Sequence, residues 1–169
     1  MVAESVRPAE ATTCYEWYSN TFVFHIRWGM RFHDPEIVNR VANIPEVAAY
    51  LGADSFDFTI AIGKPENIFL QQCGGKAIAL CEWSAPRVYE CHLIFHPECK
   101  GRDAINASRI MGDYMLAFHA NMLWGRPQVK NRPAIWHIRQ AGFSAAGFGD
   151  HPGIGAVQYF VRSKPCPPQ

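Results

Sequence analysis

Residues 95–104, FHPECKGRDA, decide the fold that this sequence predicts, because the spacing of apolar residues changes across them. Upstream, Val88–Phe95 (VYECHLIF) is rich in β-branched and aromatic residues and predicts a strand. Downstream, helical spacing predicts a helix over about Asp103–His119, with an apolar face formed by Ala107, Ile110, Met111, Tyr114, Met115 and Phe118. The stretch therefore joins the end of a strand to the start of a long helix.

This strand-to-helix junction has the chemistry of an anion site. The first turn of a helix presents free backbone N–H groups and the positive end of the helix dipole. Lys100 and Arg102 add two cations beside those groups. The junction therefore suits a phosphate or pyrophosphate, and the alternative is a charged loop with an exposed turn glycine at Gly101.

The residues before the junction predict two short helices and then an antiparallel sheet. Thr21–Met30 is β-branched and aromatic and predicts a strand, and Asp34 is a good N-cap for a helix over Pro35–Ala42. A second short helix stops at Gly52, and the weak alternation of Ser55–Ile62 is interpreted as a strand.

Three strands in the middle of the chain predict a meander. Ile68–Cys73 and Lys76–Trp83 flank Gly74-Gly75, a pair typical of a tight hairpin turn. A turn at residues 84–87 then leads into Val88–Phe95. The expected arrangement is three neighbouring antiparallel strands.

The residues after the long helix predict two more strands and one helix. Met122–Val129 is interpreted as a strand, and Asn131 as the cap of a helix that ends at Gly142. The glycine-rich Gly147–Gly155 is interpreted as a loop before a last strand, Ala156–Arg162. The fold class is α/β (α+β), a mixed and largely antiparallel central sheet flanked by about four helices. We expect a lead-in over 1–20, a single domain over 21–162 and a disordered tail over 163–169.

Composition excludes several classes of function. The chain has 169 residues, 49% of them hydrophobic, and a formal net charge of +1, which gives no strong signal for nucleic-acid binding. No run approaches the ~18 apolar residues of a membrane span, and the polar start shows no secretory leader. We therefore expect a cytoplasmic protein whose six cysteines are thiols.

A second motif lies about thirty residues after the junction. It reads Asn131-x-x-Ala134 and ends in Gly142-Phe143, so that an amide begins a helix and a glycine ends it. The junction and this motif together resemble the GNAT superfamily of CoA-dependent N-acyltransferases. The resemblance covers about residues 21–162, and its specific part is 88–143; a divergent phage-type member is one form of it.

The resemblance implies a cofactor site and an amine acceptor. Acetyl-CoA would be the co-substrate, with its pantetheine arm paired to the strand end and its pyrophosphate held by the helix start; the residues implied are Leu93, Ile94, Phe95, Lys100, Gly101, Arg102, Asp103, Ala104 and Asn131. A small-molecule or peptide amine would enter near Trp28 to Tyr50 and attack the thioester directly. Backbone N–H groups near Leu93–Phe95 would polarise the carbonyl.

The sequence departs from the family pattern at three positions. Asp103 stands where the family has a glycine, and its alternative interpretation is the N-cap of the long helix. Ile138 stands where the family often has a tyrosine that acts as a general acid and protonates the departing CoA thiolate. Ala134 stands where another branch of the family has a serine for this role. Glu90 and His92, on one face of the same strand, are the candidate catalytic bases, and Glu82 on the preceding strand is another.

Two alternatives to an acyltransferase remain at this point. Cys91, His92, His96 and Cys99 have the residue types of a zinc site, but Cys91 and His92 point to opposite faces of a strand, so no metal site is expected. The departures from the family pattern also fit a catalytically inactive GNAT-like protein with a structural or interaction role, for example one encoded by a phage.

Overall fold

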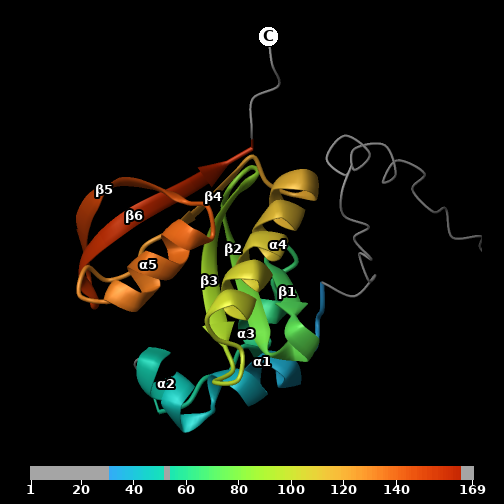
Figure 1. Cartoon of the computed structure of the whole chain (residues 1–169). Helices are drawn as coiled ribbons and strands as arrows, with labels where there is room; N and C mark the ends of the chain where they lie inside the picture. The colour runs from blue at the N-terminus through green and yellow to red at the C-terminus, as the bar shows by residue number, and fades with distance from the viewer. Residues whose placement is uncertain (1–30, 52–53, 165–169) are drawn as a thin grey trace, which may run out of the picture.

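A six-stranded sheet forms the centre of the described part of the molecule (Figure 1). The computed structural model describes residues 31–51 and 54–164. The strands lie in the order β1 (Ile68–Gln72), β2 (Ala77–Ala85), β3 (Val88–Phe95), β4 (Met122–Gly125), β6 (Gly155–Ser163) and β5 (Ser144–His151). Neighbouring strands are antiparallel except for β3 and β4, which are parallel. The mixed, largely antiparallel sheet that the sequence predicts is confirmed.

Helices cover both faces of this sheet (Figure 1). On one face, α4 (Arg102–Phe118) packs its buried residues against Ala79 and Cys81 of β2, and α5 (Arg132–Gln140) adds Ile135 and Ile138 to the same cluster. On the other face, α1 (Pro35–Ala42) packs against Ile78 and Leu80, the alternate residues of β2. The short helices α2 (Pro45–Leu51) and α3 (Thr59–Gly63) accompany α1. Alternation along β2 thus divides the core into two layers.

Local signals place several elements where the sequence predicts them. The Asp34 carboxylate accepts a hydrogen bond from the Glu36 N–H at 2.9 Å and begins α1. Strands β1, β2 and β3 form the expected meander, with the 3₁₀ turn Cys73–Gly75 between β1 and β2. Gly74 and Gly75 both have positive φ there, which explains the Gly-Gly pair.

The prediction of a strand over Ser55–Ile62 is wrong. The Asn43 side chain, at the C-cap of α1, forms hydrogen bonds with both the N–H and the C=O of Phe56. Asn39 accepts a hydrogen bond from the Phe58 N–H, so α1 and its C-cap hold this segment as a loop. Asp57 then accepts bonds from the N–H and hydroxyl of Thr59, the first residue of α3, whose N-cap position is Phe58. Side chains of α1 satisfy the backbone here in place of a neighbouring strand.

The prediction of a loop over Gly147–Gly155 is also wrong. Most of this segment lies in β5, which pairs with β6 from Ser144 to His151 around a bulge near Gly147. The ring of Tyr159 on β6 lies over Gly149, where an added Cβ would be 2.9 Å from the ring. Gly149 therefore serves close packing in a strand, whereas Gly153 and Gly155 have positive φ at the turn between β5 and β6.

Two other boundaries differ from the prediction. Strand β4 ends at Gly125, short of the predicted Val129, and only Gln128 bridges to β6 beyond it. Pro127 lacks the N–H that a longer ladder would need. Strand β6 includes Ser163, which the sequence assigned to the tail. The strand predicted over Thr21–Met30 and most of the predicted tail lie outside the described residues.

Candidate functional site

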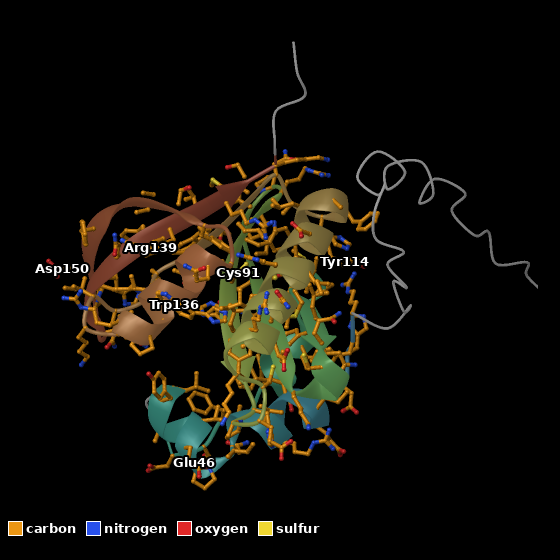
Figure 2. The ribbon with its side chains drawn as sticks, in the orientation of Figure 1. Glu46, Cys91, Tyr114, Trp136, Arg139 and Asp150 are labelled. Atoms are coloured by element: carbon orange, nitrogen blue, oxygen red, sulfur yellow. The ribbon has the colours of Figure 1, made fainter. Side chains whose placement is uncertain are left out.

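The parallel strands β3 and β4 separate shortly after they pair. Their register runs through Val88–Met122, Tyr89–Leu123 and Glu90–Trp124, after which β4 ends at Gly125. Strand β3 continues to Phe95, with β2 on one side and no described strand on the other. The last residues of β3 therefore form an open strand edge inside the molecule, between α4 and α5 on one face. In the view of Figure 2, Cys91 lies on β3 between α5 and α4.

The ladder with β2 fixes which residues face this open edge. The His96 N–H donates to the Lys76 C=O at 2.8 Å, directly opposite it in the register. Hydrogen-bonded pairs alternate in an antiparallel ladder, so Ile94 also points its backbone groups at β2. Leu93 and Phe95 point their N–H and C=O groups to the open edge. The edge thus offers two donors and two acceptors to an extended ligand.

The start of α4 lies just beyond this edge and is not capped by any side chain. Gly101, the N-cap residue, has φ 59° and ψ −126°, and an added Cβ would meet nothing within 4 Å, so the backbone conformation alone favours glycine. Asp103 lies exposed in the first turn, and the interpretation of Asp103 as the N-cap is wrong. The N–H groups of Arg102, Asp103 and Ala104 are therefore free of an intrahelical acceptor.

The loop between β3 and α4 is held from the sheet side. Lys76 Nζ lies 2.5 Å from Glu98 Oε2, and this contact raises the pKa of Lys76 and lowers the pKa of Glu98. Burial, with the Cys73 thiol next in importance, raises the pKa of Cys99 to about 12, so Cys99 is a neutral thiol. Lys100 and Arg102 form no ion pair with another described residue and remain exposed. The free positive charge of the loop therefore lies beside the uncapped helix start.

Both ends of α5 follow the second sequence motif. Asn131 Oδ1 accepts a bond from the Ala134 N–H at 3.1 Å, which confirms the predicted cap. At the other end, the Gly142 N–H donates to the Arg139 carbonyl oxygen and the Phe143 N–H donates to the Ile138 carbonyl oxygen. These are the two hydrogen bonds of a Schellman motif, in which Gly142 has φ 92°. The motif therefore fixes the length and the position of α5.

The apolar residue Ile138 lies at the point where β3 and β4 separate. A Cβ on Gly125 would be 3.0 Å from Ile138 Cδ1 and 3.6 Å from the Cys91 carbonyl oxygen. Gly125 thus lets Ile138 reach the last residue of β4. The structure places a hydrocarbon at this point, where the sequence resemblance implies a tyrosine in related proteins.

A charged cluster occupies the same point on the opposite face of the sheet. His92 Nε2 lies 3.5 Å from Glu82 Oε2 and 3.8 Å from Glu90 Oε1, and Arg126 Nε lies 2.8 Å from Glu90 Oε1. Glu90 is buried, whereas the His92 side chain is 41% exposed. His92 Nε2 itself is buried without a hydrogen-bond partner. The structure therefore brings together both candidate bases, Glu90 and His92, with Glu82.

Sequence reasoning missed the Arg126 part of this cluster. The Arg126 guanidinium also lies 5.5 Å from the centre of the Trp124 ring, whose other contacts include Tyr159 at 6.2 Å and the Ser84 hydroxyl at 3.0 Å. Trp124 and Arg126 are two residues apart at the end of a strand, so the alternation of side chains was the available signal. The contact of Arg126 with Glu90 depends on the pairing of β4 with β3, which the sequence alone does not give.

The cysteines lie away from this charged cluster. Cys91 Sγ is 3.8 Å from Cys81 Sγ on the α4 side of the sheet, and this contact, followed by burial, raises the pKa of Cys81. His92 points to the other face, as the strand alternation predicts. Within residues 31–51 and 54–164, no group of three or more His, Cys, Asp and Glu side chains could hold a metal ion.

Solved structures of acetyltransferases are similar to this chain in fold. The spermidine N-acetyltransferase SpeG from Vibrio cholerae matches with a TM-score of 0.61 and 13% identity, over 80% of this chain and 92% of that chain. The aminoglycoside acetyltransferase AAC(6')-Ib in complex with coenzyme A matches with a TM-score of 0.63 and 16% identity, over 78% and 90%. The chain has the GNAT fold. No family model and no curated protein sequence matches it.

The residues that the resemblance implies for the cofactor lie mostly at the end of β3 and at the start of α4. In this chain, the residues that the resemblance implies for the cofactor fall into one continuous path, from Leu93 and Phe95 through Gly101 to the first turn of α4. Ile94 does not join this path, since its backbone N–H and C=O point to β2 and its side chain is buried on the α1 side. Asn131 uses its side-chain oxygen for the cap of α5.

Among the described residues, no helix is both long and apolar enough to span a membrane.

Proposed function

We propose that this protein is an acyl-CoA-dependent N-acyltransferase that transfers an acetyl group from acetyl-CoA to an amine. The observation that carries the proposal is the open edge of β3, which leads directly into the uncapped start of α4. The aminoglycoside acetyltransferase among the similar structures binds coenzyme A, and spermidine and aminoglycosides are amines. The free thiols Cys73, Cys81, Cys91 and Cys99 are compatible with a reducing compartment such as the cytoplasm.

The residues of this path fit the chemistry of acetyl-CoA. An amide-bearing pantetheine arm can pair with the N–H and C=O groups of Leu93 and Phe95, as a neighbouring strand would. A pyrophosphate suits the free N–H groups of Arg102–Ala104, and Lys100 adds positive charge nearby. The exposed carboxylate of Asp103 opposes this attraction without occupying the N–H groups.

The charged cluster on the opposite face is suited to accept a proton. The acceptor nitrogen forms a bond to the thioester carbonyl carbon, the C–S bond breaks with its electrons on sulfur, and the ammonium proton passes to a base. We assign that base to His92, whose Nδ1 is the nitrogen that an acceptor can reach, since Nε2 is buried. The imidazolium that results has its Nε2–H close to the carboxylates of Glu82 and Glu90, which stabilise its charge.

The sequence resemblance implies a tyrosine at position 138 as the proton donor for the departing sulfur, and this chain has an isoleucine there. Ile138 presents a hydrocarbon at the point of strand separation. A thiolate is a fair leaving group, so the reaction can proceed without an acid at this position, and the thiolate takes its proton from water. The protein then acts through binding, positioning and the base.

Turnover of acetyl-CoA tests the proposal. Purified full-length protein is mixed with acetyl-CoA and, in separate reactions, with a polyamine, an aminoglycoside and a peptide with a free N-terminus, and release of the CoA thiol is measured. We expect thiol release with at least one amine and binding of acetyl-CoA by calorimetry. An absence of binding at millimolar acetyl-CoA would reject the proposal.

A second function is favoured by the hydrocarbon at Ile138 and by the carboxylate of Asp103. Both departures suit a GNAT-fold protein that has lost catalysis and acts as a structural or interaction module, for instance one encoded by a phage. Such a protein would show no thiol release with any amine. Measured turnover that His92→Ala abolishes would exclude this alternative.

A further inference from the structure

A histidine that no sequence motif singled out lies behind the open edge of β3. His137 projects from α5 to the first turns of α4, where its Nε2 lies 2.8 Å from the Ser108 hydroxyl. Its ring also packs on Phe95 at the end of β3, with ring centres 5.0 Å apart. His137 therefore contacts the two elements that form the proposed cofactor path.

The partners of Ser108 determine which ring nitrogen of His137 carries the proton. The Ser108 hydroxyl donates its single hydrogen to the Ala104 carbonyl oxygen at 2.9 Å. Its oxygen can then only accept from His137, so His137 Nε2 carries a hydrogen and donates it. In the neutral ring, Nδ1 is consequently a hydrogen-bond acceptor.

The environment keeps this ring neutral and leaves Nδ1 available. Burial lowers the pKa of His137, so the imidazole is uncharged at neutral pH. Nδ1 has no hydrogen-bond partner among the described residues, and it is not one of the buried unpartnered nitrogens, which are His92 Nε2 and His151 Nδ1. A neutral acceptor with a fixed tautomer is thus held beside Phe95.

The path from the start of α4 to the point of strand separation passes this ring. A ligand along the open edge must run past Phe95 and Leu93, and Leu93 and Ser108 line the same small cavity behind the edge. We propose that His137 Nδ1 accepts a hydrogen bond from an amide N–H or hydroxyl of the pantetheine arm, an inference that rests on the proposed function. His137 is then a residue for the arm of the cofactor, separate from the anion site that binds the phosphates.

Two substitutions of His137 separate its two hydrogen bonds. His137→Gln keeps a donor that can reach Ser108 but has no acceptor at the Nδ1 position. His137→Asn places an amide oxygen near the Nδ1 position but cannot reach Ser108. Ser108→Ala removes the partner while leaving the ring in place, and controls for effects of packing alone.

Affinities for two ligands, measured by calorimetry on the full chain, test the inference. Acetyl-CoA contains the arm, whereas adenosine 3',5'-bisphosphate lacks it. We expect His137→Gln to weaken acetyl-CoA binding about tenfold, the effect of one lost hydrogen bond, and to leave bisphosphate binding unchanged. His137→Asn should bind acetyl-CoA more tightly than His137→Gln while unfolding at a lower temperature. Nitrogen NMR of the wild type should show a shift of Nδ1 only with acetyl-CoA.

The possible failures are distinguishable. If the wild type binds both ligands and His137→Gln retains the wild-type affinity for acetyl-CoA, the role of His137 is overturned and the proposed function stands. If His137→Gln lowers the affinity for both ligands equally, His137 acts only through the packing of α4, and the inference is again overturned. If the wild type binds neither ligand, the proposed function fails and the inference fails with it.

Discussion

The two halves of the proposed site are built from different parts of the chain. On the cofactor side, the groups that face the ligand are backbone N–H and C=O groups of β3 and of the first turn of α4. On the acceptor side, they are the side chains of Glu82, Glu90, His92 and Arg126, which meet because of the sheet register. The first half depends on backbone conformation and the second on residue identity. Single substitutions should therefore act on the two halves in different ways.

The largest effect is expected from the side-chain half. His92→Ala removes the proposed base and should lower kcat/KM by roughly 10²–10⁴-fold, because proton removal from the ammonium then depends on water. The dissociation constant of acetyl-CoA should stay unchanged, as measured by calorimetry. Glu82→Gln, which leaves the ring in place, should give a smaller loss. Full activity in His92→Ala would show that His92 is not the base.

The backbone half should be disrupted by a single change at Gly101. Gly101→Val forces a β-branched residue into φ 59°, at a cost of roughly 1–3 kcal/mol, and displaces the start of α4. We expect acetyl-CoA affinity to fall by about 100-fold, which corresponds to ~2.7 kcal/mol. Gly153→Val is the matched control, since Gly153 has φ 88° in the turn between β5 and β6 and equally open surroundings. Similar losses of affinity in both variants would contradict the proposed role of the junction.

The point of strand separation connects the two halves and can be tested by stability. Gly125→Ala places a Cβ 3.0 Å from Ile138 Cδ1, and we expect destabilisation of about 1–2 kcal/mol in urea unfolding. Ile138→Val shortens the opposing side chain and should recover part of that loss in the double mutant. Strictly additive effects would show that the two residues do not meet.

The pH dependence of stability should report two partly buried histidines, His137 beside the first turns of α4 and His119 at the C-terminal end of α4. Burial lowers the pKa of both His119 and His137 below the ordinary value of 6.5. The unfolded chain then binds more protons than the folded chain just below that pH, so the free energy of unfolding falls as pH drops below 6.5. His137→Gln should have a shallower fall between pH 7 and pH 5 in thermal unfolding. An unchanged slope would contradict the neutral state assigned to His137.

The smallest effect is expected at Asp103. Its carboxylate opposes a bound anion across exposed solvent, so Asp103→Asn should tighten acetyl-CoA binding by about two- to threefold at low salt. The gain should disappear at high salt, whereas Asp103→Glu should show none. Loss of affinity in Asp103→Asn would indicate that this carboxylate supports the helix start.

How far the sequence predicts the structure differs between the same two halves. The junction around Gly101 and the motif from Asn131 to Gly142 were readable because helix caps and left-handed glycines leave local signals. The cluster around His92 was readable only in part, because Arg126 joins it through the pairing of β4 with β3, a contact distant in sequence. The segments 55–62 and 147–155 were misread for a related reason. The side chains of Asn39 and Asn43 bond the backbone of the first segment, and the ring of Tyr159 packs on Gly149 of the second.

The opening between β3 and β4 arises from unequal strand lengths, since β4 ends at Gly125 while β3 runs to Phe95. The unpaired edge of β3 is present before any ligand arrives, so no strand pairing must break for a ligand to reach it. Association with acetyl-CoA should therefore follow a single exponential in stopped-flow measurements, with an observed rate that rises linearly with ligand concentration. Added salt should slow that rate, because the first attraction is between Lys100, Arg102 and the ligand phosphates.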